Sequence, residues 1–371
     1  MKITLKRTPE QVELIKAMAS KNRAVAYEAQ VALAEFIGPV LAEVINNAPT
    51  LSNLFTTLQF NSEDNPSIPL DLYYDITDED YIQVYSQSVA GGLPQNQVLP
   101  TSSEMKIATY SLDSALSFDR RYAAKSRMDV VSKTFTRMAQ EILAKQERTS
   151  AGLILGSLAN ATTNSKSHVI RAGTNGRFLL DDLNRLFTLA KRINTSFSKG
   201  TPVSRSSRGL TDIIVSPELV QELRSMAYNP INTKGTKTDI TAPDAMRTDI
   251  YNSAGIPEFY GVSIMEINEL GAGQKFNDIF DTLAGGTTYG GVAFDGAAAK
   301  DEIIIGLDRT RDSLVRAVAT DSDNGSEFNL TADDQYSIRQ NKIGYFGSLE
   351  EGRMVLDTRA LVGVIASGIG V

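Results

Sequence analysis

Hydrophobic and polar positions alternate strictly along residues 68–76. The residues that point one way are Ile68, Leu70, Leu72, Tyr74 and Ile76. A period of two predicts a β-strand with one buried face. Residues 81–86 form a second candidate strand, residues 91–94 mark a turn, and residues 104–112 return as another strand. The pattern therefore predicts a long β-hairpin, which needs a partner surface because an isolated two-stranded hairpin is only marginally stable in water.

The chain begins with a helical pattern. Thr8 is placed as an N-cap and Pro9 as the first helical residue. The apolar stripe that follows is interrupted at Asn22, and Gly38-Pro39 should break or kink the helix. We therefore expect an extended N-terminal arm that lies on other surfaces and contributes little to a self-contained core.

A long helix is predicted in the middle of the chain. Ser126-x-x-Asp129 resembles a capping box, and the apolar stripe that follows can be carried to about Leu158. A helix of roughly 30 residues spans about 45 Å. This helix should act as a spine.

The second half has an α/β pattern. Two helices are predicted, over residues 180–194 and 217–228, the second directly after a strand at 212–215. Further strands are predicted near 261–267, 302–306, 313–319 and 334–346. The apolar C-terminal tail is expected to be buried.

Composition narrows the class of protein. The chain has 371 residues, 42% of them hydrophobic, and a net charge of −7. It contains no cysteine, which excludes disulfides and thiolate metal sites and fits a reducing compartment. The N-terminus lacks the apolar core of a signal peptide, and no run of 18 apolar residues predicts a membrane span.

Charge is segregated along the chain. Between Arg23 and Lys106 there is no lysine or arginine but there are eleven acidic residues, seven of them within 63–80. From Lys106 to Arg148 there are nine basic and five acidic residues. A solvated acidic face is one explanation. The other is that the acidic segment lies on the basic segment of a neighbouring copy.

No catalytic, cofactor or metal site is predicted. His168, the only histidine, lies in a polar stretch without partners at triad or metal-ligand spacing. The Gly271–Gly273 segment lacks the third glycine of a dinucleotide-binding loop, and Asp321–Gly325 lacks the closing glutamate of a calcium loop. These absences argue against a soluble α/β enzyme, which stays open as an alternative.

The order of these elements resembles the major capsid proteins of tailed bacteriophages, the Hong Kong 97 fold. Three stretches carry the resemblance: Ile107–Leu116 leading into the spine, Asp212–Leu219, and the ending from Asp334–Arg339 through Gly344 to Met354–Leu361. The resemblance implies an α+β fold with an N-terminal arm, an extended β-hairpin (the E-loop), a P-domain with a long spine helix and an α/β A-domain. The implied boundaries are 1–60 for the arm, 61–111 for the E-loop, 112–165 for the spine, 166–325 for the A-domain and 326–371 for the closing P-domain strands.

The resemblance also implies a function. Hexamers and pentamers of the chain would form an icosahedral shell around phage double-stranded DNA, without sequence-specific binding and without a membrane. The protein would be assembled in the host cytoplasm and end up in the virion, with possible cement, scaffolding and portal proteins as partners. An encapsulin-type nanocompartment shell is the closest alternative; the long N-terminal arm argues against it.

The resemblance and the charge pattern together predict contacts between subunits. In such shells the E-loop lies across the neighbouring subunit. The residues expected in this contact are Asp71, Asp75, Asp78, Glu79 and Asp80 on the acidic side and Arg120, Arg121 and Arg127 on the basic side. The type member of the family cross-links its shell through an E-loop lysine. This hairpin tip has no lysine, so the shell would be held by noncovalent contacts or by a cement protein.

Overall fold

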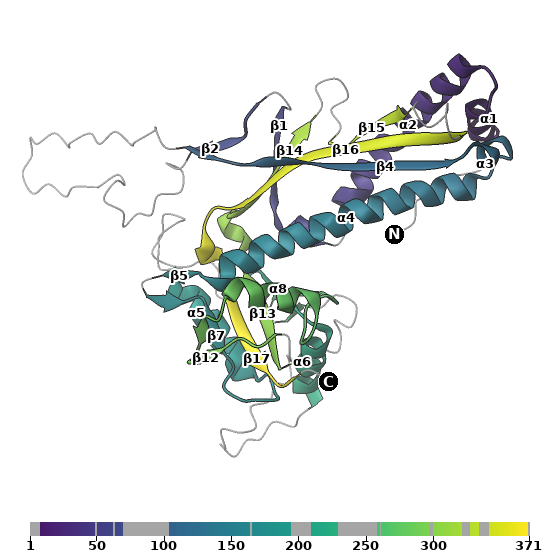
Figure 1. Ribbon diagram of the computed structural model, residues 1–371. Coiled ribbons are helices and arrows are strands. Elements are labelled where there is room, and N and C mark those ends of the chain that lie inside the picture. Colours follow the sequence, from purple (N-terminus) through teal and green to yellow (C-terminus); the bar gives the residue numbers. More distant parts are fainter. Residues whose placement is uncertain are drawn as a thin grey trace, which may run out of the picture. The chain divides into compact units, whose positions relative to one another are not determined.

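The computed structural model describes most of the chain (Figure 1). The described ranges are 8–48, 50–61, 64–69, 104–163, 165–193, 209–228, 258–259, 261–296, 300–320, 327–333 and 341–369. The chain divides into two compact units. The first comprises 1–67, 106–150 and 315–354, and the second comprises 68–105, 151–314 and 355–371.

The first unit contains a five-stranded sheet. Its strands are β1 (Thr56–Asn61), β4 (Thr109–Asp119), β14 (Leu314–Thr320), β15 (Asn329–Asp333) and β16 (Lys342–Val355). The order is β1-β14-β16-β15, with β4 on β16. β1 runs parallel to β14, whereas β4 and β16 form a long antiparallel ladder from Thr109 opposite Gly352 to Asp119 opposite Lys342.

Helices cover this sheet. They are α1 (Pro9–Met18), α2 (Arg23–Asn46), the short α3 (Arg120–Ala124) and most of α4 (Met128–Ala159), with a 3-10 turn η1 (Leu51–Leu54) before β1. α1 and α2 share one hydrophobic core with α4 and the sheet: Ile15, Leu33 and Ile37 are buried in the same cluster as Phe135 and Tyr345. The expectation that the N-terminal arm adds little to a core is therefore wrong.

The start of α1 confirms the sequence prediction, since the Thr8 side chain accepts a hydrogen bond from the Gln11 backbone N–H. Asn22 does not interrupt a helix; it caps α2 by accepting from the Ala24 N–H. The predicted break at Gly38-Pro39 is wrong, because α2 continues through Pro39. Pro39 lies on the exposed side of α2, and Gly38 is buried with Leu330 of β15 close by.

The long helix α4 has 32 residues and confirms the predicted spine. Its predicted cap is wrong. Ser126 adopts a left-handed backbone with φ of 50°, and its buried hydroxyl has no hydrogen-bond partner among the described residues. The chain instead enters α4 through a tight turn in which the Met128 N–H bonds to the Ser126 carbonyl.

The base of the predicted hairpin is present. β2 (Ser67–Pro69) pairs with β3 (Glu104–Lys106) in a two-stranded ladder, and the Ile107 N–H donates to the Pro66 carbonyl. The remainder of the predicted hairpin, residues 70–103, lies outside the described residues. The five carboxylates Asp71, Asp75, Asp78, Glu79 and Asp80 lie in that part.

The second unit contains a six-stranded mixed sheet with the order β7-β17-β13-β8-β10-β9. The strands are β7 (Val169–Arg171), β8 (Asp212–Val215), β9 (Glu258–Phe259), β10 (Val262–Glu266), β13 (Asp301–Leu307) and β17 (Leu361–Ser367). Among the described residues of this unit, the helices besides the end of α4 are α5 (Leu180–Ile193), α6 (Pro217–Tyr228) and α8 (Lys275–Ala284). Smaller elements are β5 (Thr162–Thr163), β6 (Lys166–Ser167), β11 (Thr288–Tyr289), β12 (Val292–Ala293), η3 (Arg309–Arg311) and η4 (Thr358–Ala360).

These elements confirm an α+β fold and most of the strands and helices predicted in the second half. One assignment differs. The last strand, β17, was expected with the closing P-domain strands of 326–371, but it pairs with β13 and β7 at the centre of the second unit's sheet. Its residues from Leu361 to Ala366 are all buried, which explains the apolar composition of the tail. The predicted loop at 229–243 and the acidic turn at 321–325 lie outside the described residues.

Candidate interaction site

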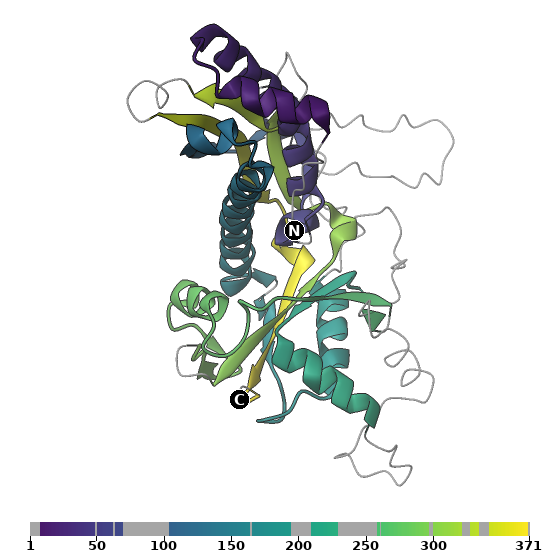
Figure 2. The same ribbon diagram turned by 90° about the vertical axis from the view of Figure 1, so that its right-hand side faces the viewer.

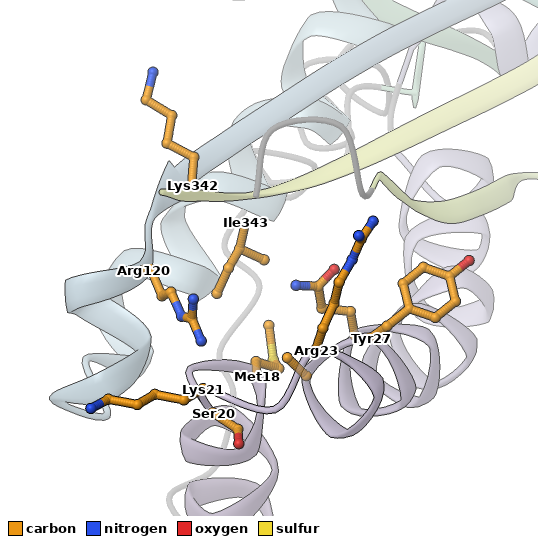
Figure 3. Close-up of a pocket in the computed structure, with 10 residues that line it drawn as sticks. Met18, Ser20, Lys21, Arg23, Tyr27, Arg120, Lys342 and Ile343 are labelled. Atoms are coloured by element: carbon orange, nitrogen blue, oxygen red, sulfur yellow. The ribbon is translucent and has the colours of Figure 1, made fainter. Parts of the chain in front are cut away.

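A pocket of about 160 Å³ opens in the first unit where the α1–α2 turn meets α3 and the start of β16 (Figure 3). Four of its lining residues are cationic. The full lining is Met18, Ser20, Lys21, Arg23, Ala26, Tyr27, Gln30, Arg120, Lys342 and Ile343. We call it the basic pocket.

Two caps create the turn that forms one wall of the pocket. α1 ends at Met18 and α2 begins at Arg23 after its cap Asn22, so only four residues connect the two helices. The Ser20 side chain accepts from the Asn22 backbone N–H at 3.2 Å, which holds the turn closed. This geometry fixes Lys21 and Arg23 on either side of the Asn22 cap.

The floor of the pocket is apolar and rigid. Met18 and Ile343 are 0% and 1% exposed, and Ala26 is also buried. The Tyr345 hydroxyl lies 3.9 Å from the Met18 sulfur, and the ring of Tyr345 packs edge-on against Phe135 of α4. The floor therefore belongs to the main core of the first unit.

Arg120 joins two elements within the pocket. Its Nε and Nη2 donate to the Ala19 carbonyl at 3.3 and 3.1 Å. Ala19 is the C-cap of α1, where a positive charge interacts favourably with the helix dipole. In Figure 3 the Arg120 guanidinium points toward Met18, whereas the ammonium groups of Lys21 and Lys342 extend outward.

Like charges gather around this opening. Lys21 and Arg23 are exposed and Lys342 is partly exposed, and no Asp or Glu lines the pocket within the described part of the chain. Clustered cations over a low-dielectric wall attract anionic groups and raise their local concentration. Gln30, only 4% exposed, adds an amide to the lining. The pocket is thus suited to a carboxylate or phosphate.

The predicted basic residues have different surroundings. Arg120 lines the pocket, as described above. Arg121 pairs with Asp119 of its own chain at 3.2 Å, and its side chain is 81% exposed. Hydrogen bonding from the Arg121 backbone N–H lowers the pKa of the Asp119 carboxyl. Arg127 is exposed before the start of α4 and does not line the pocket.

Three of the pocket cations were missed by sequence reasoning. Lys21 and Arg23 lie in the turn that was read as an interrupted helix, and recognising Asn22 as a cap would have placed them together. Lys342 is brought in by the β4–β16 register, in which it lies opposite Asp119. That register depends on long-range pairing, and no local signal reveals it.

A buried ionic cluster lies elsewhere in the first unit. Glu351, fully buried, accepts from Arg316 Nε at 2.9 Å and from Arg353 Nη2 at 3.1 Å. Burial raises the pKa of the Glu351 carboxyl, but Arg353 and then Arg316 outweigh it, and the pKa falls below its ordinary value. Burial and the Glu351 charge raise the pKa of Tyr110, which donates to the same carboxylate, to about 12.

The remaining contacts of this cluster are also internal. Arg353 Nη1 donates to the hydroxyls of Ser52 and Ser150, and its guanidinium lies 5.4 Å from the centre of the Phe55 ring. Gln146 Nε2 donates to Glu351 at 3.0 Å. The cluster links α4, η1, β14 and β16, so we assign it a structural role.

His168 has a structural role as well. It is fully buried rather than part of a polar loop: Nδ1 donates to the carbonyls of Thr358 and Leu361, and Nε2 accepts from the Thr163 hydroxyl at 2.7 Å. Burial lowers its pKa, so the neutral ring is favoured. Across the described ranges, no three His, Cys, Asp or Glu side chains are grouped so that they could hold a metal ion. None of the described helices is both long and apolar enough to cross a membrane.

Comparison with known proteins gives structural matches only. No protein-family model matches the chain, and no curated protein matches its sequence. The chain is similar to the capsid of cyanophage P-SCSP1u, at 11% identity over 86% of this chain and 88% of that one, with a TM-score of 0.49. The capsid of the native GTA particle gives 13% identity, coverage of 86% and 90%, and a TM-score of 0.49.

An encapsulin is also among the matches. The holo-SrpI encapsulin complex from Synechococcus elongatus PCC 7942 gives 13% identity, 85% coverage of each chain and a TM-score of 0.45. Further matches include the mature capsid of bacteriophage PhiM1, at 10% identity over 85% of this chain and 86% of that one, with a TM-score of 0.44.

Proposed function

We propose that this chain is a structural protein, the major capsid protein of a tailed phage, which assembles as hexamers and pentamers into a closed shell around double-stranded DNA. One observation carries the proposal. The chain separates its charges into an acidic segment, residues 63–80, with seven carboxylates and no cation, and a basic pocket without any carboxylate among its described lining residues. A chain that carries both halves of a complementary pair can bind copies of itself repeatedly.

Several architectural features support this proposal. α4 and the β4–β16 ladder give the first unit a long frame, and a hairpin base, β2 with β3, stands at the start of β4. A hairpin that continues from such a base needs cover from another surface. The contact between the five carboxylates Asp71, Asp75, Asp78, Glu79 and Asp80 and the basic residues of a neighbour is part of the proposal. Cement, scaffolding and portal partners, and assembly in the host cytoplasm, are further predictions.

The test is assembly of the purified full-length chain. Electron microscopy and sedimentation at several salt concentrations should show closed shells of uniform size. Monomers or dimers under all conditions would exclude the proposed function. Cargo separates the two kinds of shell: DNA inside particles from infected cells supports a capsid, whereas an enzyme cargo would indicate an encapsulin.

A second measurement addresses how the shell is held. Boiled, denatured particles should run as a single band near 40.3 kDa, because residues 24–105 offer no lysine for a cross-link. A ladder of heavier bands would show a covalent chemistry that the sequence does not suggest.

A further inference from the structure

We propose that the basic pocket at the α1–α2 turn receives the acidic segment, residues 63–80, of a second copy of this chain. The inference rests on the proposed function and names the partner of the pocket. It also moves the receiving surface away from Arg121 and Arg127, which do not line the pocket, to Lys21, Arg23 and Lys342 together with Arg120.

Charge complementarity identifies the occupant. Seven carboxylates lie within residues 63–80 and no lysine or arginine accompanies them. The pocket offers four cations, a buried amide from Gln30, and the half-exposed ring of Tyr27 beside them. Within residues 68–76 polar and apolar positions alternate, with Asp71 and Asp75 among the polar ones, so a strand there could present carboxylates to the cations and an apolar edge to the ring.

The geometry of the first unit argues for a second copy. The pocket lies at the Asp119 end of β4, because Arg120 follows Asp119 and Lys342 pairs with it. The acidic segment leaves the described chain near the opposite end, where Pro66 is hydrogen-bonded to Ile107, just before β4 begins at Thr109. The two ends of β4 are about 33 Å apart at 3.3 Å per residue.

The length of the chain after Pro66 limits how far its carboxylates can lie from that residue. An extended chain covers at most about 3.6 Å per residue. Asp71, five residues beyond Pro66, reaches no more than about 18 Å, and Asp75, nine residues beyond it, no more than about 32 Å. Asp78, twelve residues beyond Pro66, has a limit of about 43 Å, so it covers the distance only if the chain runs back along β4 almost fully extended. A neighbouring copy meets no such limit, so all the carboxylates of the segment become available to the pocket.

The absence of cysteine allows a direct test. Two single-cysteine chains are prepared, one with Lys21→Cys in the pocket and one with Asp78→Cys in the acidic segment. They are co-assembled and treated with a short bis-maleimide. Because each chain has one thiol, a cross-link between different chains gives a band at twice 40.3 kDa. We expect this band at least 10-fold stronger than with Arg137→Cys, a control on α4 whose side chain is 77% exposed.

Charge reversal tests the same contact through the rate of assembly. The double variant Lys21→Glu, Lys342→Glu should slow assembly at low salt by 10-fold or more, since steering by complementary charge changes association rates by about 10- to 1,000-fold. Adding Asp78→Lys and Asp80→Lys to the same chain should restore the rate. The control Arg137→Glu removes a positive charge outside the pocket and should leave the rate unchanged. Unfolding curves of the unassembled variants confirm that they fold.

The outcomes are distinct. Closed shells without the pocket-specific cross-link would overturn this inference and leave the proposed function standing. If the pocket reversal leaves the assembly rate unchanged and lowers only DNA retention, the pocket binds phosphate and the inference is wrong. A chain that never assembles would instead count against the proposed function itself.

Discussion

The two compact units cover their sheets to different degrees. In the second unit all seven residues of β13 are buried, and β17 is buried along nearly its whole length. In the first unit, five of the six residues of β1 are exposed and only two of the eleven residues of β4 are buried, although six of the seven residues of β14 are buried. When both faces of a sheet are covered within its own unit, neither face is left for another molecule. When one face stays exposed, that face can contact other molecules.

The exposed apolar side chains follow the same division. On α2, Phe36 is 54% and Val40 39% exposed, and on the sheet Leu58 and Phe346 are similarly open. The second unit also exposes Leu283 and Val292, so the difference is one of degree. The comparison indicates that substitutions can change the free energy of unfolding and the association of copies separately. Core substitutions should have the main effect on the second unit, whereas both core and surface substitutions should affect the first.

Deleting residues 1–48 should have the largest effect on the first unit. The deletion removes Ile15, Met18, Leu33, Ile37 and Leu41, all buried in its core. Each such side chain is worth about 1.5–3 kcal/mol, so the five together contribute about 7.5–15 kcal/mol, which is comparable to the whole 5–15 kcal/mol that stabilises a typical domain. Calorimetry should show the loss of one unfolding transition and the survival of the transition of the second unit.

A chain that starts at Thr8 is the control for this deletion and should retain both transitions. The sequence pattern led to a different expectation, namely that the deletion impairs the particle but not the fold. Two intact transitions in the deleted chain would restore that view and contradict the shared core.

The substitution Glu351→Gln should destabilise the first unit by about 3–5 kcal/mol, because it leaves Arg316 and Arg353 buried without their carboxylate. Denaturant unfolding measures the loss. Glu350→Gln, one residue earlier on β16 and partly exposed, should change stability by less than about 0.5 kcal/mol. Equal losses from the two substitutions would contradict the role of the buried cluster.

The same variant has a pH signature. The folded pKa of Glu351 lies below the ordinary value of 4.5, so its contribution is present above pH 4.5 and is lost as the pH falls through the folded pKa. Wild-type stability should therefore fall more steeply in acid than that of Glu351→Gln. If the stability of the wild type and of the variant falls in parallel as the pH is lowered, the pKa of the Glu351 carboxyl is not lowered in the folded state.

His168→Gln tests the second unit, with a smaller effect. At pH 7 the loss of buried hydrogen bonds should cost about 1–3 kcal/mol. In the wild type, stability should also decline as the pH falls below 6.5, because the unfolded histidine binds a proton that the folded one resists. The variant should lose this slope, since the chain has no other histidine. If the variant keeps the wild-type slope of stability against pH between pH 7 and 5, groups other than His168 cause that slope.

Phe36→Ser should change the stability of the unassembled chain least, within about 0.5 kcal/mol, because the side chain is already half exposed. If the outer face of α2 is covered on assembly, the variant should assemble more slowly. Leu283→Ser, 40% exposed in the second unit, is the matched control and should assemble like the wild type. Light scattering during assembly measures both, and equal effects would remove the distinction between the units.

Local rules predicted the elements whose ends are defined by nearby residues. Thr8 with Pro9, and Ser216 with Pro217, place the starts of α1 and α6 correctly because a cap followed by proline depends only on neighbours. Two misreadings were also local. Asn22 and Ser126 were each judged by residue type, whereas backbone geometry made Asn22 a cap and placed Ser126 in a left-handed turn.

Long-range pairing set the limit of sequence reasoning. Arg120 was selected from charge alone, but its neighbours in the basic pocket come from a helix turn and from a strand near the other end of the chain. Glu351 was overlooked because its partners Gln146, Arg316 and Arg353 come from α4, β14 and β16, and only the folded arrangement of these elements brings them together. Pro39 was judged by propensity, and tertiary packing of α2 outweighed it.

The position of β17 has a consequence for how the protein is made. This strand is made after every other strand of its sheet yet lies between β7 and β13, and the first unit likewise needs β14 and β16, which are made long after β1 and β4. Pairing between such distant segments forms late and slowly. A nascent or prematurely ended chain therefore lacks the centre of one sheet, and often of both. Only a chain translated through β17 can complete both sheets, so any surface that depends on them exists only after that strand has been made.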